Sequence, residues 1–427
     1  MRYVCSVVIL FLLQLPVFGQ LTVPAPKQEG GVVILHAKAH LGNGQVIEDA
    51  AVAFREGAIT FVGPAADWRG SADFRVIEAR GKHLYPGFIA ANTSLGLNEI
   101  ELVRATRDER EVGELNPNVR ALIAYNTDSE VIPTIRSNGV LLAQIVPQGG
   151  TVAGQSSVVQ LDAWNWEDAA YRTDGGIHVY WPRATRFGFQ EAGADNTNRY
   201  AEELAGLELL FREAEAYAKT KEHQPENLKL EAMRGLFSGE KTLFVHANDA
   251  KDIQRAVLLG EQFGLRTVIV GGRDAWMIAA FLKEKQAAVV LQKTQSLPGR
   301  EDEAVDQPFR TPSQLKEAGV LFCISAEAFW QQRNLPFQAG QAAGHGLDRE
   351  AAVQAITLDA ARILGIDQTT GSIEKGKDAT LFLSTGDALD MRSSIVETAF
   401  IQGRQIDLDD KHKALYKKYQ AKYQVKD

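Results

Sequence analysis

The sequence predicts an α/β protein in which a TIM-like (β/α)8 barrel is joined to a small composite β-sandwich formed by both chain ends. Three observations lead to this prediction. Short strands with glycine turns come first, buried-strand patterns then alternate with helical patterns, and strands return near the C-terminus. Such alternation is typical of parallel strands with helical crossovers. The alternating stretch, residues 86–366, has the length of an eight-stranded barrel rather than of a short open sheet.

The first β unit is expected over residues 32–85, with strands at 32–39, 51–54 and 59–62 and a turn at Glu56-Gly57. Strand and turn patterns return at 371–385 and 396–406. We therefore expect residues 367–407 to pack with residues 32–85 as one composite sandwich beside the barrel.

Within the barrel, buried-strand patterns occur at residues 139–147, 242–246, 266–270, 287–291 and 320–325. The clearest helices are expected at 199–220 and 349–364. Asp348 and Gly365 are suitable N-cap and C-cap residues for the second of these helices. Cys323 lies within the last strand pattern, where a thiol usually acts as a small buried hydrophobe rather than as a nucleophile.

The chain ends differ from the rest. Arg2 precedes an almost unbroken apolar run at residues 4–13, which is too short to span a bilayer but typical of a signal peptide. We expect residues 1–19 to be removed on export to the periplasm or the cell exterior, leaving no membrane span. Cys5 would leave with them, so no intramolecular disulfide is expected. Residues 408–427 form a highly charged, Lys/Tyr-rich tail with a helical pattern.

The chain carries 46 basic and 54 acidic residues, for a formal charge of −8. We find no Lys/Arg cluster suited to tracking a phosphate backbone, so nucleic acid is not an expected partner.

Several sequence segments resemble those of the amidohydrolase superfamily, particularly of its imidazolonepropionase-like branch. The resemblance extends over almost the whole mature chain and is strongest at residues 346–352, 355–365 and 371–381. The resemblance of these segments implies the barrel and sandwich fold but does not indicate a catalytic activity.

In this family the first barrel strand carries Pro-Gly, a few apolar residues and two histidines separated by one residue. Here the strand begins at Pro86-Gly87 and has Asn92 and Ser94 at the two histidine positions. Two imidazoles at positions i and i+2 of a strand lie on the same face and can coordinate one divalent ion. A carboxamide and a hydroxyl are weak zinc ligands, so this half of the site is not expected to hold metal.

The resemblance places the other metal ligands at the ends of the fifth, sixth and eighth strands. His246 matches the fifth-strand histidine, whereas Gly271 and Ala326 stand where the family has a histidine and a proton-abstracting aspartate. For the bridging lysine, the segment 149–162 has Gln160 in the most suitable place. His246 would be the metal ligand if any metal binds; otherwise it is a hydrogen-bonding residue of the barrel mouth.

Two further features allow more than one interpretation. The Gly- and Ser-rich segment 149–157 lacks the ending of a phosphate loop and a nucleophile elbow, so we interpret it as a ligand-facing barrel loop. Trp164, Trp166 and Trp181 are expected in the core, although a binding cleft or a subunit contact is an alternative.

These observations predict an exported, catalytically degenerate amidohydrolase-like protein that acts by binding. The candidate partners are a small-molecule ligand at the barrel mouth and an active paralogue in a homo- or hetero-oligomer. No cofactor is expected. The alternative is a hydrolase of carbon–nitrogen bonds other than peptide bonds, with a divalent metal such as zinc. The predicted pocket lining is Asn92, Ser94, Gln160, His246, Asn248, Gly271 and Ala326.

Overall fold

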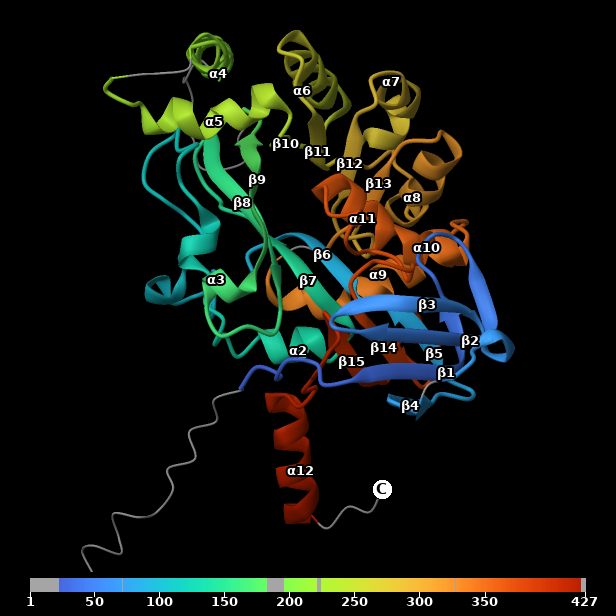
Figure 1. Cartoon of the computed structure of the whole chain (residues 1–427). Helices are drawn as coiled ribbons and strands as arrows, with labels where there is room; N and C mark the ends of the chain where they lie inside the picture. The colour runs from blue at the N-terminus through green and yellow to red at the C-terminus, as the bar shows by residue number, and fades with distance from the viewer. Residues whose placement is uncertain (1–22, 71, 183–195, 221–223, 327, 424–427) are drawn as a thin grey trace, which may run out of the picture.

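The computed structural model describes residues 23–70, 72–182, 196–220, 224–326 and 328–423. The predicted signal peptide, residues 1–19, lies outside these ranges. The described chain forms two eight-stranded sheets (Figure 1).

One of the two sheets is the predicted barrel, and its strands follow one another in chain order. Seven of the eight strands run in the same direction, while the third runs opposite to both of its neighbours. The strands are β6 (Phe88–Thr93), β7 (Val140–Ile145), β8 (Val152–Gln160), β9 (Ala170–Tyr180), β10 (Thr242–Ala247), β11 (Thr267–Gly271), β12 (Ala288–Leu291) and β13 (Phe322–Ile324).

The antiparallel strand β8 corrects the interpretation of residues 149–157 as a loop. Residues 152–157 form the first part of β8 and are buried. Because β8 joins β7 and β9 by antiparallel pairing, this part of the barrel needs no helical crossover. Only a short helix, α3 (Trp166–Ala169), stands between β8 and β9, and α2 (Ile132–Arg136) precedes β7.

Helical crossovers cover the second half of the barrel, as the alternation predicts. The stripe that predicted a helix at 199–220 belongs to α4 (Asn196–Ala218), in which Leu207, Phe211 and Ala214 are buried. The remaining crossovers are α5 (Leu228–Ser238), α6 (Ala250–Gln262), α7 (Ala279–Glu284) and α8 (Gln307–Glu317), and α9 (Leu335–Ala343) follows β13. In α6, Gly260 packs against Thr267 so closely that a Cβ atom would lie 1.9 Å from the hydroxyl oxygen.

The helix predicted at 349–364 is broken in two, α10 (Arg349–Ala355) and α11 (Leu358–Leu364). Its predicted ends are correct: the Asp348 side chain accepts a hydrogen bond from the Ala351 amide, and Gly365 has the left-handed C-cap conformation, with φ 66°. The break occurs because the carbonyl of Ile356 accepts a hydrogen bond from the Ile89 amide of β6, at 2.9 Å. Thr357 accordingly leaves the helical conformation, with φ −131° and ψ −95°.

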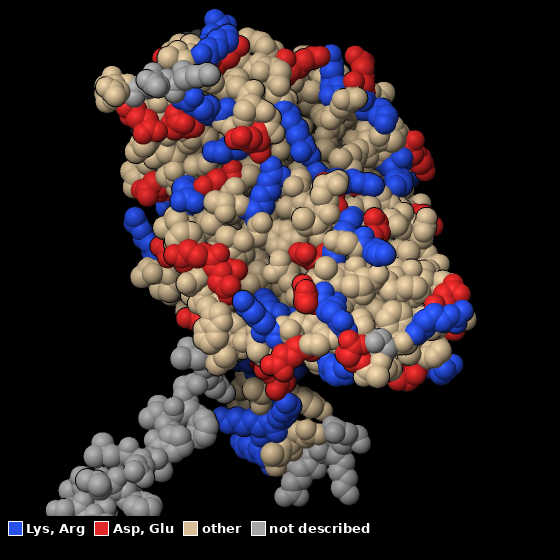
Figure 2. Space-filling view, in the orientation of Figure 1, with Lys and Arg blue, Asp and Glu red and all other residues tan. Residues whose placement is uncertain are grey.

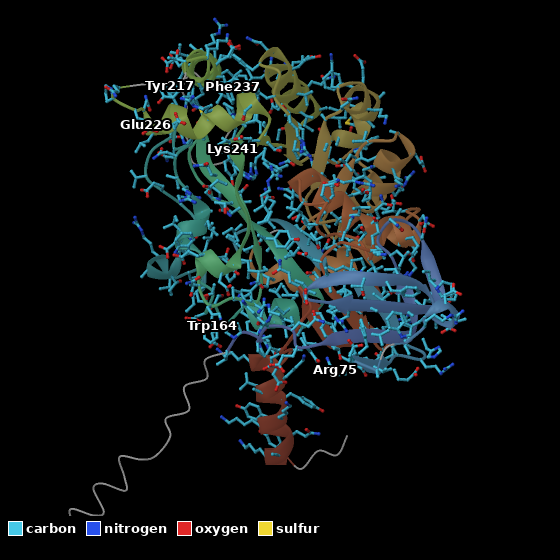
Figure 3. The ribbon with its side chains drawn as sticks, viewed as in Figure 1. Arg75, Trp164, Tyr217, Glu226, Phe237 and Lys241 are labelled. Atoms are coloured by element: carbon cyan, nitrogen blue, oxygen red, sulfur yellow. The ribbon has the colours of Figure 1, made fainter. Side chains whose placement is uncertain are left out.

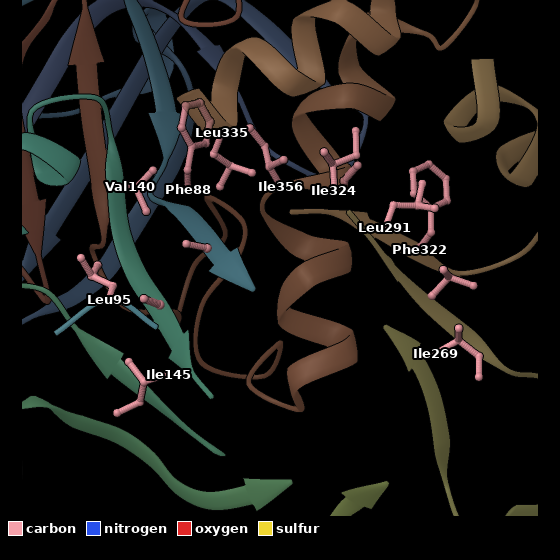
Figure 4. Close-up of a cluster of buried hydrophobic side chains, with 14 of the residues drawn as sticks. Phe88, Leu95, Val140, Ile145, Ile269, Leu291, Phe322, Ile324, Leu335 and Ile356 are labelled. Atoms are coloured by element: carbon pink, nitrogen blue, oxygen red, sulfur yellow. The ribbon is translucent and has the colours of Figure 1, made fainter. Parts of the chain in front are cut away.

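Helix α11 closes the barrel where β13 and β6 are not paired. Its Ala360, Ile363 and Leu364 side chains belong to the cluster of interior strand residues that includes Phe244 and Cys323. Phe88, Ile324 and Ile356 lie in a second buried cluster along this seam (Figure 4). Cys323 is fully buried in β13, as predicted, and its burial raises the pKa of the thiol.

The other sheet combines strands from both chain ends, as predicted. The N-terminal strands are β1 (Gly31–His40), β2 (Val46–Arg55), β3 (Ala58–Pro64), β4 (Phe74–Glu78) and β5 (His83–Pro86). They join β14 (Leu381–Ser384), β15 (Val396–Ile401) and β16 (Arg404–Ile406) through antiparallel pairing of β5 with β14. The side chains of Ile34, Phe54 and Phe400 are buried in the core of this sheet.

The tail forms a helix, α12 (Lys411–Tyr423), which projects from the body (Figure 1). None of its residues is buried, and its lysines form a basic cluster on a surface that otherwise mixes both signs of charge (Figure 2). In the described ranges, no helix combines the length and apolar character needed to cross a bilayer.

The three tryptophans predicted in the core have different environments. Trp181 is buried and Trp166 is partly buried. Trp164, labelled in Figure 3, is 65% exposed. For Trp164 the prediction of a core position is wrong, because it lies in the loop between β8 and α3.

Candidate functional site at the barrel mouth

Most of the predicted site residues lie where the parallel strands end. Asn92 and His246 are near the carboxyl ends of β6 and β10, and Gly271 ends β11. Ser94, Asn248 and Ala326 follow β6, β10 and β13 within one or two residues. In barrel enzymes this end of the sheet carries the active site.

Gln160 does not join them. Because β8 runs antiparallel, its last residue pairs with Leu142 near the start of β7 and lies toward the opposite end of the barrel. There its side chain donates to the carbonyl of Asp168 and accepts from Arg404 and from the amide of Asp162. The position proposed for a bridging lysine is therefore not part of the mouth.

The polar centre of the mouth consists of Gln144, Ser156 and His178, none of which was predicted as a site residue. All three are buried and come from β7, β8 and β9. Gly176, His178 and Tyr180 are spaced two residues apart in a strand pattern. Residues with this spacing lie on one face of a strand, which was the available signal that the side chains of His178 and Tyr180 point the same way.

These residues form a hydrogen-bonded chain across the barrel. The amide of Asn92 donates to Oε1 of Gln144 at 3.1 Å, and Nε2 of Gln144 lies 3.0 Å from Oγ of Ser156. Oγ of Ser156 lies 2.8 Å from Nε2 of His178. Nδ1 of His178 lies 2.9 Å from Nε2 of His246. The mouth thus contains a continuous polar connection from β6 to β10.

Aromatic rings hold both imidazoles in place. The ring of His178 is stacked on Phe244, with centroids 4.8 Å apart and planes within 4°. The ring of His246 is stacked on Tyr180, with centroids 4.0 Å apart and an interplanar angle of 14°. Asn92 adopts a left-handed conformation, with φ 55°, which asparagine tolerates better than most residues.

A cavity of about 210 Å³ lies at the ends of β10, β11 and β12. Asn248, Gly271 and Gln292 are among its lining residues. A Cβ atom at Gly271 would lie 2.6 Å from Oδ1 of Asn248, so only glycine leaves the carboxamide in its place. Two of the predicted pocket residues, Asn248 and Gly271, therefore line an actual cavity.

Known proteins resemble this chain in both sequence and structure. The model of the amidohydrolase family matches residues 321–406. The chain is 24% identical to the imidazolonepropionase of Rhizobium rhizogenes over 374 residues, which cover 80% of this chain and 88% of that protein. The crystal structure of an amidohydrolase from Thermotoga maritima MSB8 superposes with a TM-score of 0.75 and 25% identity, covering 88% of this chain and 99% of that one.

The chain is a member of the amidohydrolase superfamily. Amidohydrolase tasK of Hapsidospora irregularis is also similar, at 25% identity over 368 residues, which cover 74% of this chain. The match covers 37% of tasK, so this chain corresponds to a part of that longer protein. A molinate hydrolase structure, at 16% identity and a TM-score of 0.55, shares the amidohydrolase fold.

The amidohydrolase mouth of this chain offers few metal-binding groups. Within the described ranges, no group of three or more His, Cys, Asp or Glu side chains is placed to hold a metal ion. Nε2 of His246 already faces Nδ1 of His178. Carboxamide and hydroxyl groups such as those of Asn92 and Ser94 do not complete a zinc site. The donor set therefore does not fit a divalent cation, while the correspondence of these positions to the family's ligands stays a prediction.

Burial keeps both imidazoles of this amidohydrolase barrel uncharged at neutral pH. Desolvation lowers the pKa of His246 to about 3, although the side chain is partly accessible. The pKa of His178 is also lowered well below its usual value, first by desolvation and then by the neighbouring His246. Neutral imidazoles can act as hydrogen-bond donors and acceptors but contribute no positive charge to the mouth.

We expect the amidohydrolase fold to lose stability as the pH falls below about 6.5. An unfolded histidine binds a proton near that pH, whereas His246 binds one only near pH 3 when folded. Between these values the unfolded state holds more protons, so the free energy of unfolding falls with decreasing pH. Urea titrations at pH 7.5, 6 and 5 measure this loss.

The matched variants are His246→Phe, which should reduce the pH dependence, and His412→Gln, which changes a histidine of the projecting helix and should not. Equal pH dependence in wild type and His246→Phe would show that the loss has another source.

Proposed function

We propose that this protein is an exported, catalytically degenerate amidohydrolase that binds a small polar molecule at the carboxyl ends of its barrel strands. The observation that supports the proposal most is the state of His246. This imidazole is the one residue of the predicted metal set that could ligate an ion, and its Nε2 lies 2.9 Å from a second imidazole. The cavity at the ends of β10, β11 and β12 is lined by the carboxamides of Asn248 and Gln292 and by charged and apolar residues that include Arg273, Glu303 and Leu291. Such a lining suits a hydrogen-bonding ligand.

The export of the protein is part of this proposal. It is supported by the apolar run at residues 4–13, which is preceded by Arg2. The periplasm and the cell exterior are both consistent with such a segment.

A second candidate function, that of a subunit in complex with an active paralogue, is supported by α12. This helix carries Tyr416, Tyr419 and Tyr423, which are 61%, 49% and 65% exposed. Tyrosine is enriched in protein interfaces. Catalysis in such a complex would belong to the partner.

The rival candidate is a hydrolase of carbon–nitrogen bonds, and the names of two relatives, an amidohydrolase and an imidazolonepropionase, favour it. Under this alternative, most metal ligands would be residues other than those at the predicted metal positions of the barrel mouth.

A metal and activity measurement separates these candidates. The mature protein is purified without chelators and its zinc, manganese, iron and nickel contents are determined. Hydrolysis of cyclic amides and short acyl-amino acids is then assayed. We expect less than stoichiometric metal and no turnover, because a lone imidazole does not retain a divalent cation.

His246→Ala and His412→Ala serve as a matched pair in this experiment. Stoichiometric metal together with turnover that His246→Ala abolishes and His412→Ala preserves would overturn the proposal in favour of the hydrolase. Metal-free protein that co-elutes with an active homologue would support the subunit function instead of ligand binding alone.

A further inference from the structure

The hydrogen bonds of the barrel mouth have a direction, and that direction starts at Gln144. Its Oε1 accepts from the backbone amide of Asn92 at 3.1 Å. A backbone amide can only donate, so this contact fixes which end of the carboxamide is oxygen. The amino end of Gln144 therefore faces Ser156, at 3.0 Å, and donates to its hydroxyl oxygen.

The hydroxyl of Ser156 donates its hydrogen bond to His178. The hydroxyl is 1% exposed, and its hydrogen-bond partners among the described residues are Nε2 of Gln144 and Nε2 of His178. The amino group of Gln144 can only donate to Ser156. The hydroxyl of Ser156 therefore donates to Nε2 of His178, at 2.8 Å. The opposite direction would leave a buried hydroxyl proton without an acceptor, which is costly.

A second contact supports the same direction. Nε2 of Gln144 lies 3.5 Å from Nε2 of His178. If Nε2 of His178 carried a proton, two N–H donors would face each other inside the barrel. An unprotonated Nε2 instead presents a lone pair to both the serine hydroxyl and the carboxamide.

The tautomer of His246 follows from that of His178. A neutral imidazole without a proton on Nε2 carries it on Nδ1, so His178 donates from Nδ1 to Nε2 of His246 at 2.9 Å. His246 then carries its own proton on Nδ1. No hydrogen bond to this nitrogen is formed within the described part of the chain, and His246 is partly exposed.

We infer that Gln144, Ser156 and His178 are positioning residues that hold His246 as a hydrogen-bond donor, so that the mouth receives a ligand through an acceptor oxygen such as a carbonyl or a carboxylate. This inference rests on the proposed ligand-binding function and names the chemical class of the group that binds. In this arrangement neither nitrogen of His246 offers a free lone pair to a metal ion, because one nitrogen accepts from His178 and the other carries a proton.

The test reads the tautomers directly. Protein labelled with ¹⁵N-histidine gives imidazole nitrogen signals from its eight histidines at pH 7.5, and His178→Gln and His246→Gln assign the two of interest. We expect both residues to have protonated Nδ1 and unprotonated Nε2. A protonated Nε2 on either residue overturns the inference.

Two further measurements test the positioning role. In His178→Phe, which keeps a flat ring but removes the donor, His246 should lose its single Nδ1-protonated state. The control Ser157→Ala, which changes the residue next to Ser156 on β8, should leave that state unchanged. Persistence of the pure Nδ1–H form in His178→Phe contradicts the role of His178. Added zinc should not move either signal, and a zinc-dependent shift of His246 contradicts the inference.

These measurements require neither ligand nor turnover. Failure of the tautomer assignment therefore leaves the proposed binding function standing, whereas failure of the proposed function through metal content and turnover is observed independently.

Discussion

Replacing Asp162 by asparagine is expected to lower the free energy of unfolding by about 3–5 kcal/mol, the usual effect of removing one partner from a buried ion pair. The Asp162 carboxylate is 3% exposed and pairs with Arg136 and, at 3.0 Å, with Arg404. It also accepts from the amide of Ala25 at 2.9 Å. Asparagine would leave the buried guanidinium of Arg136 and the partly buried guanidinium of Arg404 without this counter-charge.

The measurement is urea unfolding of Asp162→Asn beside Glu167→Gln, which removes an exposed carboxylate from the same region. The control should stay within about 0.5 kcal/mol of wild type. Because Arg404 belongs to β16 and Arg136 to α2, this carboxylate joins the composite sheet to the barrel. A loss below about 1 kcal/mol in Asp162→Asn would mean that the two arginines are solvated in solution.

The second large effect is expected for Phe244→Ala, which should cost about 3–5 kcal/mol of unfolding free energy. Phe244 is 2% exposed and packs inside the barrel in the cluster that includes Ile363 and Leu364 of α11. Removal of the ring loses the apolar burial and leaves a cavity that a closed barrel cannot collapse. It also removes the ring on which His178 is stacked.

Leu258→Ala is the matched control, because Leu258 is 47% exposed on α6. Thermal and urea unfolding of the two variants give the comparison. If both variants lose the same stability, the interior of the barrel is not packed as the structure describes.

Much of the fold could be predicted because burial leaves a periodic pattern. Continuous apolar runs such as residues 320–325 identify strands covered on both faces, and their alternation with amphipathic helices predicts parallel order. The direction of β8 could not be predicted, because an antiparallel strand buried on both faces has the same composition as a parallel one. The break at Thr357 could not be predicted either, because it depends on a hydrogen bond to Ile89, which lies far away in the sequence.

The candidate site was only partly predictable for a similar reason. Asn92, His246 and Gly271 lie at the ends of recognisable strands, and those ends meet in any parallel barrel. Gln144 and Ser156 are ordinary polar residues within strand patterns, and their importance arises from contacts between β7 and β8. Gln160 was placed at the mouth from the resemblance alone, and the antiparallel direction of β8, which carries it to the opposite end of the barrel, depends on strand pairing that the sequence does not reveal.

The pairing of β5 with β14 and the contact of Ile89 with Ile356 have a consequence for biosynthesis. Each sheet contains a strand edge from the first 93 residues that is completed only by residues beyond 355. A ribosome delivers the chain from its N-terminus, so neither sheet can be completed until nearly all of the polypeptide has emerged. On the export that we propose, a translocation channel that accepts only unstructured chains would encounter the polypeptide before either sheet is complete.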